Sequence, residues 1–121
     1  MLERMKDQPA HALALEASGT VMARDVEAAV EAALGPTGAP TGLVIVISRD
    51  FDGYLAELAR GLANVSVAHR SIVRIAVVTD ADRMDEAKLK PWSASAVPIR
   101  FFSAEERRDA CDWADAAGRG D

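Results

Sequence analysis

The chain has 121 residues, 50% of them hydrophobic and 27% charged, which is typical of one soluble globular domain spanning residues 1–121. Its formal net charge of −5 argues against a nucleic-acid partner, because nucleic-acid-binding surfaces require clustered positive charge. A single cysteine excludes an internal disulfide framework, and the sequence shows no signal-peptide core and no apolar run of bilayer length. We therefore expect a cytoplasmic protein.

The first part of the chain predicts a β-hairpin followed by a helix. Residues 2–6 alternate loosely, residues 7–9 supply a turn, and residues 11–18 put Leu13 and Leu15 on one strand face and Ala12 and Ala14 on the other. The proline in the turn places the first strand at a sheet edge. Helical spacing then joins six residues: Met22, Val26, Ala29, Val30, Ala33 and Leu34. Gly35-Pro36 ends this helix, and residues 35–42 form a surface connection.

Two apolar runs in the middle of the chain predict buried strands. Residues 43–47 and 72–79 carry apolar side chains on both faces, which is typical of strands covered by helices. Between them lies a helical stripe formed by Leu55, Leu58, Ala59, Leu62 and Val65. Gly61 within this stripe costs about 1 kcal/mol relative to alanine, so we expect it to permit close packing. Residues 82–91 predict a short helix that ends at Pro91.

The last part of the chain predicts an edge strand and a capped helix. Val97, Ile99 and Phe101 alternate, and Pro98 places this strand at or near an edge. Ser103 and Glu106 form a capping box, and the helix that follows turns Ala110, Trp113, Ala114 and Ala117 inward and ends near Gly118. The element order ββαβαβαβα predicts an α/β fold with a mostly parallel five-stranded sheet whose first strand is antiparallel.

This order and several short strings resemble the SpoIIAA-like branch of the STAS domains, which is related in fold to the lipid-carrying CRAL-TRIO domains. The strings are ALALEASG, RDFDG, RIAVVTD, and RFF with the helix that follows it as far as Trp113. The similarity covers the chain from His11 to about Trp113. It implies a βα superhelix with no enzymatic activity and no cofactor. It also implies either protein–protein regulation or the holding of an apolar ligand near a membrane.

One loop departs from the pattern of the family it resembles. In anti-anti-sigma members, the loop after the central strand carries a phosphorylatable Ser or Thr at the start of the next helix. Here the loop reads Asp50-Phe51-Asp52-Gly53-Tyr54, with no hydroxyl other than that of the tyrosine. Its two carboxylates stand where a phosphate would add roughly −1.5 to −2 charges. The sequence therefore argues against a sigma-factor role controlled by phosphorylation.

Acidic residues follow both central strands, Asp50 and Asp52 after the first and Asp80 and Asp82 after the second. If the strands are neighbours, these carboxylates crowd the edge where open α/β sheets bind ligands, and they form a weak candidate site for a divalent cation such as Mg²⁺. The simpler interpretation, which we favour, is that Asp52 and Asp82 cap the helices that follow, each worth ~1 kcal/mol. Neither histidine has a metal-ligand neighbour at a suitable spacing, and Cys111 has the context of a half-buried small hydrophobe.

Aromatic and flexible apolar residues gather in the two segments after the central strands: Phe51, Tyr54, Leu55, Met84, Leu89 and Trp92. Such side chains can line an adaptable cleft for a lipid or another apolar molecule, with Pro91 and Trp92 touching a membrane at its mouth. The alternative is ordinary core with one partly exposed tryptophan. Our leading hypothesis is a non-enzymatic domain that binds an apolar small molecule or lipid. The alternative function is a protein-interaction regulator without the phospho-switch, whose partner is another protein or a second copy of the chain.

Overall fold

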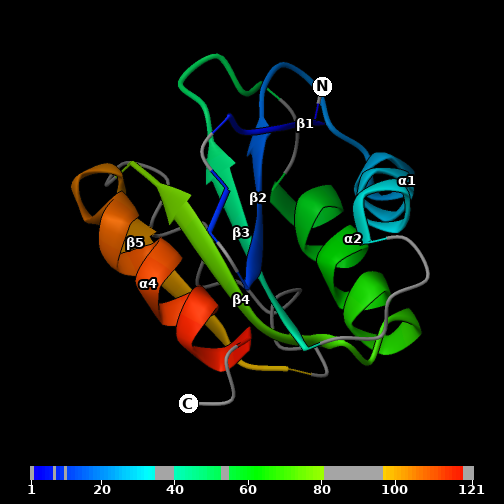
Figure 1. Ribbon diagram of the computed structural model, residues 1–121. Coiled ribbons are helices and arrows are strands. Elements are labelled where there is room, and N and C mark those ends of the chain that lie inside the picture. The colour runs from blue at the N-terminus through cyan, green and yellow to red at the C-terminus, as the bar shows by residue number, and fades with distance from the viewer. Residues whose placement is uncertain are drawn as a thin grey trace.

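The protein folds as one five-stranded sheet with helices against both faces (Figure 1). The structure, a computed structural model, describes residues 2–6, 8, 9, 11–34, 40–52, 55–80 and 97–118. The elements in chain order are β1 (Leu2–Arg4), β2 (Ala12–Ala17), α1 (Ala23–Leu34), β3 (Thr41–Ile47), α2 (Leu55–Ala68), β4 (Ile72–Thr79), β5 (Ile99–Ser103), the 3-10 turn η3 (Ala104–Glu106) and α4 (Arg107–Gly118). The short helix predicted at 82–91 lies outside the described residues.

The strands stand in the order β1-β2-β3-β4-β5, so each strand lies beside its neighbour in sequence. β1 pairs antiparallel with β2, whereas β2, β3, β4 and β5 pair in parallel. This confirms the predicted α/β fold, including the antiparallel first strand. β5 is an edge strand, as the proline before it predicts. The two strands read from apolar runs, β3 and β4, are neighbours in the centre of the sheet.

Alternation along the central strands divides the core into two layers. Leu43, Ile45 and Ile47 of β3 pack in the layer that contains residues of α1 and α2. Val44 and Val46 point to the other face, where they pack against Ala110 and Ala114 of α4. In Figure 1, α1 and α2 lie on one side of the sheet and α4 lies on the other. Helices cover both faces of this strand, which is why residues 43–47 are apolar at every position rather than at every second one.

The two helices on the first face pack closely at Gly61. A Cβ atom at Gly61 would lie 2.7 Å from Cβ of Val26 and 2.8 Å from the carbonyl oxygen of Ala23, both in α1. The same pair of helices is joined by the Ala23 N–H, which donates a hydrogen bond of 3.5 Å to the Glu57 carboxylate. The predicted close packing at Gly61 is therefore confirmed, and the first turn of α1 obtains an acceptor from α2.

α4 approaches the sheet at two glycines. A Cβ atom at Gly42 of β3 would lie 2.6 Å from the carbonyl carbon of Ala114, and its carbonyl oxygen is nearer still. A Cβ atom at Gly118 would collide with the His11 carbonyl oxygen. The Asp115 carboxylate accepts a hydrogen bond of 2.6 Å from the His11 N–H. These contacts allow the α4 backbone to lie directly on the sheet.

Arginine and aromatic side chains pack together where α4 contacts β4 and β5. The Arg74 guanidinium lies 4.9 Å from the centre of the Trp113 ring and donates a hydrogen bond of 2.9 Å to the Trp113 carbonyl. Trp113 contacts Phe102 at 6.0 Å between ring centres, and the Arg100 guanidinium lies 5.0 Å from the Phe102 ring. Each guanidinium is thus held by an aromatic face, which adds to the burial of these rings.

Three local predictions need correction. Met22 does not join the inward stripe of α1: it precedes the helix, is 38% exposed, and its N–H donates to the Asp25 carboxylate at 2.9 Å. β3 begins at Thr41, two residues earlier than predicted, because Gly42 lies against α4 and its N–H donates to the His11 carbonyl at 3.0 Å. β5 begins at Ile99, two residues later than predicted.

The capping box at the start of the last helix is confirmed. The Ser103 N–H donates a hydrogen bond of 2.9 Å to the Glu106 carboxylate, and the turn that they close is the 3-10 segment η3. This backbone hydrogen bond holds the pKa of Glu106 below its usual value. Of the residues predicted to face inward, Ala110 and Ala114 are fully buried, whereas Trp113 and Ala117 are half-buried.

None of the helices in the described part of the chain combines the length and the apolar character needed to cross a lipid bilayer.

Candidate functional site

The candidate site lies where the parallel strands end. Ala17 of β2 stands beside Ile47 of β3, and Val46 stands beside Val78 of β4, so the loops after these strands begin at one edge of the sheet. Open α/β sheets commonly bind their ligands at this edge. The described part of the edge comprises residues 18–21 after β2, residues 48–52 after β3, and Asp80 after β4.

Hydrogen bonds join the loop after β2 to the loop after β3. The Asp52 N–H donates to the Gly19 carbonyl at 2.9 Å, and the Thr20 hydroxyl donates to the Asp52 carboxylate at 2.7 Å. Closer to the strands, the Ser48 N–H donates to the Ala17 carbonyl at 2.8 Å. Gly19 has a φ of 59°, a left-handed conformation that favours glycine and lets the first loop turn back toward the second. The two loops therefore form one connected surface.

Phe51 anchors this surface from below. Its side chain is only 2% exposed and belongs to the core layer beneath α1 and α2. Its N–H donates to the Ser48 carbonyl at 3.1 Å, which closes the turn after β3. Because Phe51 points into the core, its neighbours Arg49, Asp50 and Asp52 face solvent. The edge thus presents charged groups on a loop whose position is fixed by a buried aromatic ring.

The predicted role of Asp52 as a helix cap stays a prediction, because residues 53 and 54, between Asp52 and α2, lie outside the described residues. The described part of α2 begins at Leu55, and the Asp52 carboxylate accepts a hydrogen bond from the Thr20 hydroxyl, a contact that the sequence did not predict. Asp50 is exposed and Asp80 is half-buried, while Asp82 lies outside the described residues. Across the ranges that the structure describes, no group of three or more His, Cys, Asp or Glu side chains could hold a metal ion.

The six residues predicted to line an apolar cleft are placed only in part. Phe51 lies in the core, and Leu55 is the first residue of α2. Tyr54, Met84, Leu89, Trp92 and the side chain of Leu55 fall outside the described residues. The apolar cleft therefore stays a prediction.

Thr79, the last residue of β4, is a polar group that the sequence analysis did not single out. It is 1% exposed, and within the described part of the chain its hydroxyl has no hydrogen-bond partner. Alternation along β4 places it on the same face as Ile75 and Val77, toward α1 and α2. A buried hydroxyl without a partner is unusual in a folded protein and costs about 1–3 kcal/mol.

Thr20 and Ser48 were also missed, for two different reasons. Ser48 carries a recognisable signal, since it is the first polar residue after an apolar strand. Thr20 carries none, because its partner Asp52 lies 32 residues away in another loop. Outside this edge, Cys111 is half-buried as predicted, and burial raises the pKa of its thiol, which disfavours the reactive thiolate.

Comparison with known proteins assigns the chain to a family. The sequence model of the SpoIIAA-like family matches residues 12–115, a range that runs from the first residue of β2 into α4. No curated protein and no solved structure matches the chain significantly. The matched range contains the four parallel strands and both core layers, in the order that the resemblance implies. The chain therefore belongs to the SpoIIAA-like family.

Proposed function

We propose that this SpoIIAA-like domain is a non-catalytic interaction module that binds a protein partner at the edge formed by residues 18–21 and 48–52. The observation that carries the proposal is the pair of hydrogen bonds from Thr20 and from the Asp52 N–H, which fix the two loops to each other. A surface that is already ordered loses little conformational entropy when it binds. SpoIIAA-like domains are generally non-catalytic and commonly mediate protein interactions, which supports the same function.

The charges at this edge indicate what the partner must offer. Asp50 and Asp52 are exposed carboxylates on the loop that, in phosphorylated relatives of this fold, carries the regulatory hydroxyl. Their negative charge is permanent, so binding would not wait for a kinase. The partner is expected to present arginine or lysine side chains to this loop, and increasing salt should weaken the complex.

Charge reversal tests this proposal. The domain and two variants, Asp50→Lys and Glu31→Lys, would be tagged, expressed in native cells and cross-linked before purification. Both substitutions replace an exposed acid with a lysine, but Glu31 lies on α1, away from the loop edge. The proposal expects a partner that both the unaltered domain and Glu31→Lys retain and that Asp50→Lys loses. Equal recovery of every cross-linked protein with all three baits would contradict it.

The second candidate function is the binding of an apolar small molecule or lipid, with contact to a membrane surface. Thr79 favours it, because its buried hydroxyl, which has no partner among the described residues, could receive the polar head of such a ligand at the end of β4. The apolar residues expected around it are Tyr54, Leu55, Met84, Leu89 and Trp92.

Native mass spectrometry and tryptophan fluorescence test this second candidate. The hypothesis expects a co-purified lipid, and lipid vesicles should shift the emission of Trp92 to shorter wavelength when Trp113 is replaced by phenylalanine. Leu89→Asp should remove the shift and leave the circular dichroism spectrum unchanged. If no small molecule co-purifies and Trp92 emission ignores lipid, this function is wrong.

A further inference from the structure

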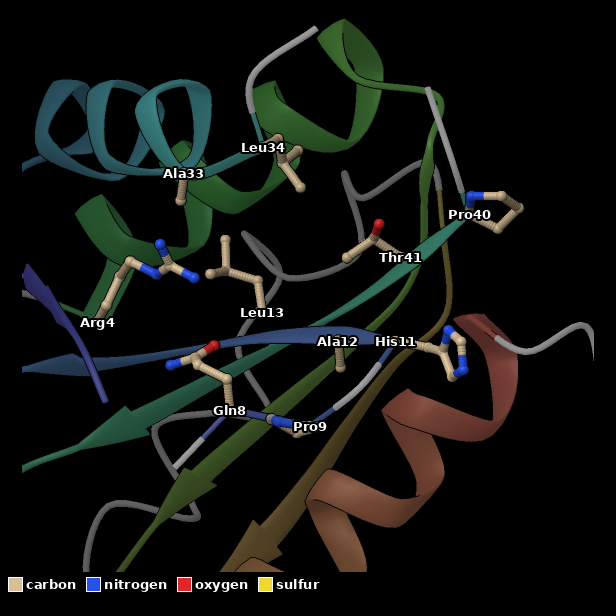
Figure 2. A pocket seen from close by; sticks show the side chains of 10 residues that line it. All are labelled: Arg4, Gln8, Pro9, His11, Ala12, Leu13, Ala33, Leu34, Pro40 and Thr41. Atoms are coloured by element: carbon tan, nitrogen blue, oxygen red, sulfur yellow. The ribbon is translucent and has the colours of Figure 1, made fainter. Parts of the chain in front are cut away.

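A hollow of about 270 Å³ lies at the opposite edge of the sheet from the loop edge described above. It is bounded by the beginnings of β2 and β3, by the last turn of α1 and by the end of β1 (Figure 2). Leu13, Ala33 and Leu34 give it an apolar wall, while Arg4, Gln8 and Thr41 provide polar groups. Its volume is close to the lower limit for small-molecule sites in proteins, so it suits a ligand of few atoms.

The charge of this hollow differs in sign from that of the whole protein. The chain carries a net charge of −5, yet no carboxylate is among the described residues that line the hollow. Arg4 supplies a cation there, and no ion pair joins Arg4 to another described residue. Figure 2 shows the Arg4 side chain extending from β1 toward Leu13, below Ala33. A guanidinium beside apolar side chains is a suitable partner for the carboxylate of a small organic acid.

The polar side of the hollow is held in place before any ligand binds. The Gln8 side-chain amide donates to the Met5 carbonyl at 2.7 Å and to the Ala14 carbonyl at 2.8 Å. Its oxygen accepts a hydrogen bond of 2.8 Å from the Ala14 N–H. These three bonds tie the connection between β1 and β2 to the middle of β2, so Arg4 projects from a fixed hairpin. A preformed site loses less entropy on binding than a mobile one.

The last turn of α1 fixes the orientation that a ligand could take. A helix carries a partial negative charge at its C-terminus, and Ala33 and Leu34 are the last residues of α1. A carboxylate is therefore disfavoured near these residues and favoured at Arg4, whereas an alkyl chain can lie on the side chains of Ala33 and Leu34. We propose that this hollow binds a small organic monocarboxylate, with its carboxylate on Arg4 and its alkyl chain against Leu13, Ala33 and Leu34.

Titration with hexanoate, followed by amide chemical shifts in NMR spectra, tests the proposal. The expected result is saturable binding with a dissociation constant of about 1 mM or lower, and shifts that centre on residues 12, 13, 33, 34 and 41. 1-Hexanol lacks the charge and inorganic phosphate lacks the alkyl chain, so each should bind at least about tenfold more weakly. Adipate should also bind more weakly, because its second carboxylate would meet the C-terminus of α1.

Two pairs of variants separate the site from general effects. Arg4→Met should weaken hexanoate binding about tenfold or more, whereas Arg24→Met, on the exposed face of α1, should leave it unchanged. Ala33→Phe should fill the hollow and abolish binding, and Ala32→Phe, on the exposed neighbouring position, should not. Amide spectra without ligand would show that each variant is folded.

Three outcomes would overturn the proposal. They are the absence of saturable shifts below about 10 mM hexanoate, binding that survives Arg4→Met and Ala33→Phe, and equal affinity for phosphate. Shifts centred on residues 48–52 would place hexanoate at the loop edge, which contradicts this proposal and favours the apolar-ligand function instead.

Discussion

Replacing Gly42 with alanine should dislodge the C-terminal helix from the sheet. The added Cβ atom would lie 2.6 Å from the Ala114 carbonyl carbon and 2.8 Å from its Cβ, with the carbonyl oxygen closer than either. The obstructing atoms belong mostly to the helix backbone, so no side-chain rotation relieves the contact and α4 must shift as a body. Overpacking of this kind costs about 1–3 kcal/mol, and backbone atoms place Gly42→Ala near the upper value.

The net effect is smaller because alanine also restricts the unfolded chain. Replacing a glycine by alanine stabilises a protein by about 0.4–1 kcal/mol where the native backbone allows it. The difference leaves a net loss of about 2 kcal/mol in the free energy of unfolding. Urea unfolding followed by circular dichroism measures it, and with a slope near 2 kcal/mol per molar the midpoint should fall by about 1 M.

A second substitution identifies which atoms obstruct the alanine. Ala114→Gly removes the Ala114 Cβ atom but leaves its carbonyl group, which is the nearer obstacle. The double variant Gly42→Ala/Ala114→Gly should therefore be no more stable than Gly42→Ala alone, and a glycine inside α4 should cost about 1 kcal/mol more. A loss below about 0.5 kcal/mol for Gly42→Ala would refute the close approach of α4 to β3, and recovery in the double variant would refute the carbonyl group as the main obstacle.

Three further predictions concern the core, the loop edge and the last helix. Ile75→Ala should lower the free energy of unfolding by about 2–5 kcal/mol, since Ile75 is 0% exposed; a loss below about 0.5 kcal/mol in a urea titration would contradict its place in β4. Thr20→Val should remove the hydrogen bond to Asp52 and lower the free energy of unfolding by only about 0.5 kcal/mol, because the position is exposed. Amide hydrogen exchange at residues 48–52 should nevertheless become faster. Unchanged exchange would mean that this bond does not fix the two loops to each other. The pKa of Glu106 is lower in the folded state than its value of 4.5 in the unfolded chain. The Glu106 carboxylate therefore stabilises the protein at a pH above 4.5, and this stabilisation is lost as the pH falls through the folded-state pKa. The melting temperature of Glu106→Gln should thus lie below that of the unaltered protein at pH 7 and converge with it in acid; a constant difference would contradict this linkage.

The sequence predicts the elements well where apolar periodicity is strong. Leu13 and Leu15 alternate with Ala12 and Ala14 across the two layers as expected, and β3 and β4 follow from their continuous apolar runs. These patterns are reliable because burial acts on every residue of the element at once. The topology then follows from the alternation of strands and helices.

Predictions failed where contacts between distant segments decide the outcome. Gly42 was assigned to a loop from its local composition, but α4, about seventy residues later, packs on it and makes it part of β3. The hydrogen bond from the Thr20 hydroxyl to Asp52 was not predicted, because Thr20 reaches Asp52 from another loop. Met22 fits the helical spacing of α1, yet its side chain is exposed because the helix starts after it.

The candidate site could be located from the sequence but not specified in detail. The strand exit at Asp50 and Asp52 indicated the edge at which the parallel strands of the sheet end, which the structure shows. The connection of this loop to Thr20 and the burial of the Thr79 hydroxyl depend on tertiary packing, which leaves no local pattern.

Site-specific photo-cross-linking in living cells tests the proposed protein-binding edge most directly. A photoreactive amino acid would replace either Arg49, exposed beside Asp50, or Arg70, exposed just beyond α2 at the other end of the sheet. Both substitutions remove one exposed arginine, so they change charge equally. The interaction function predicts a discrete protein adduct from position 49 that is absent at position 70 and diminished in the Asp50→Lys background. Adducts of equal yield at both positions, or none at position 49, would contradict it.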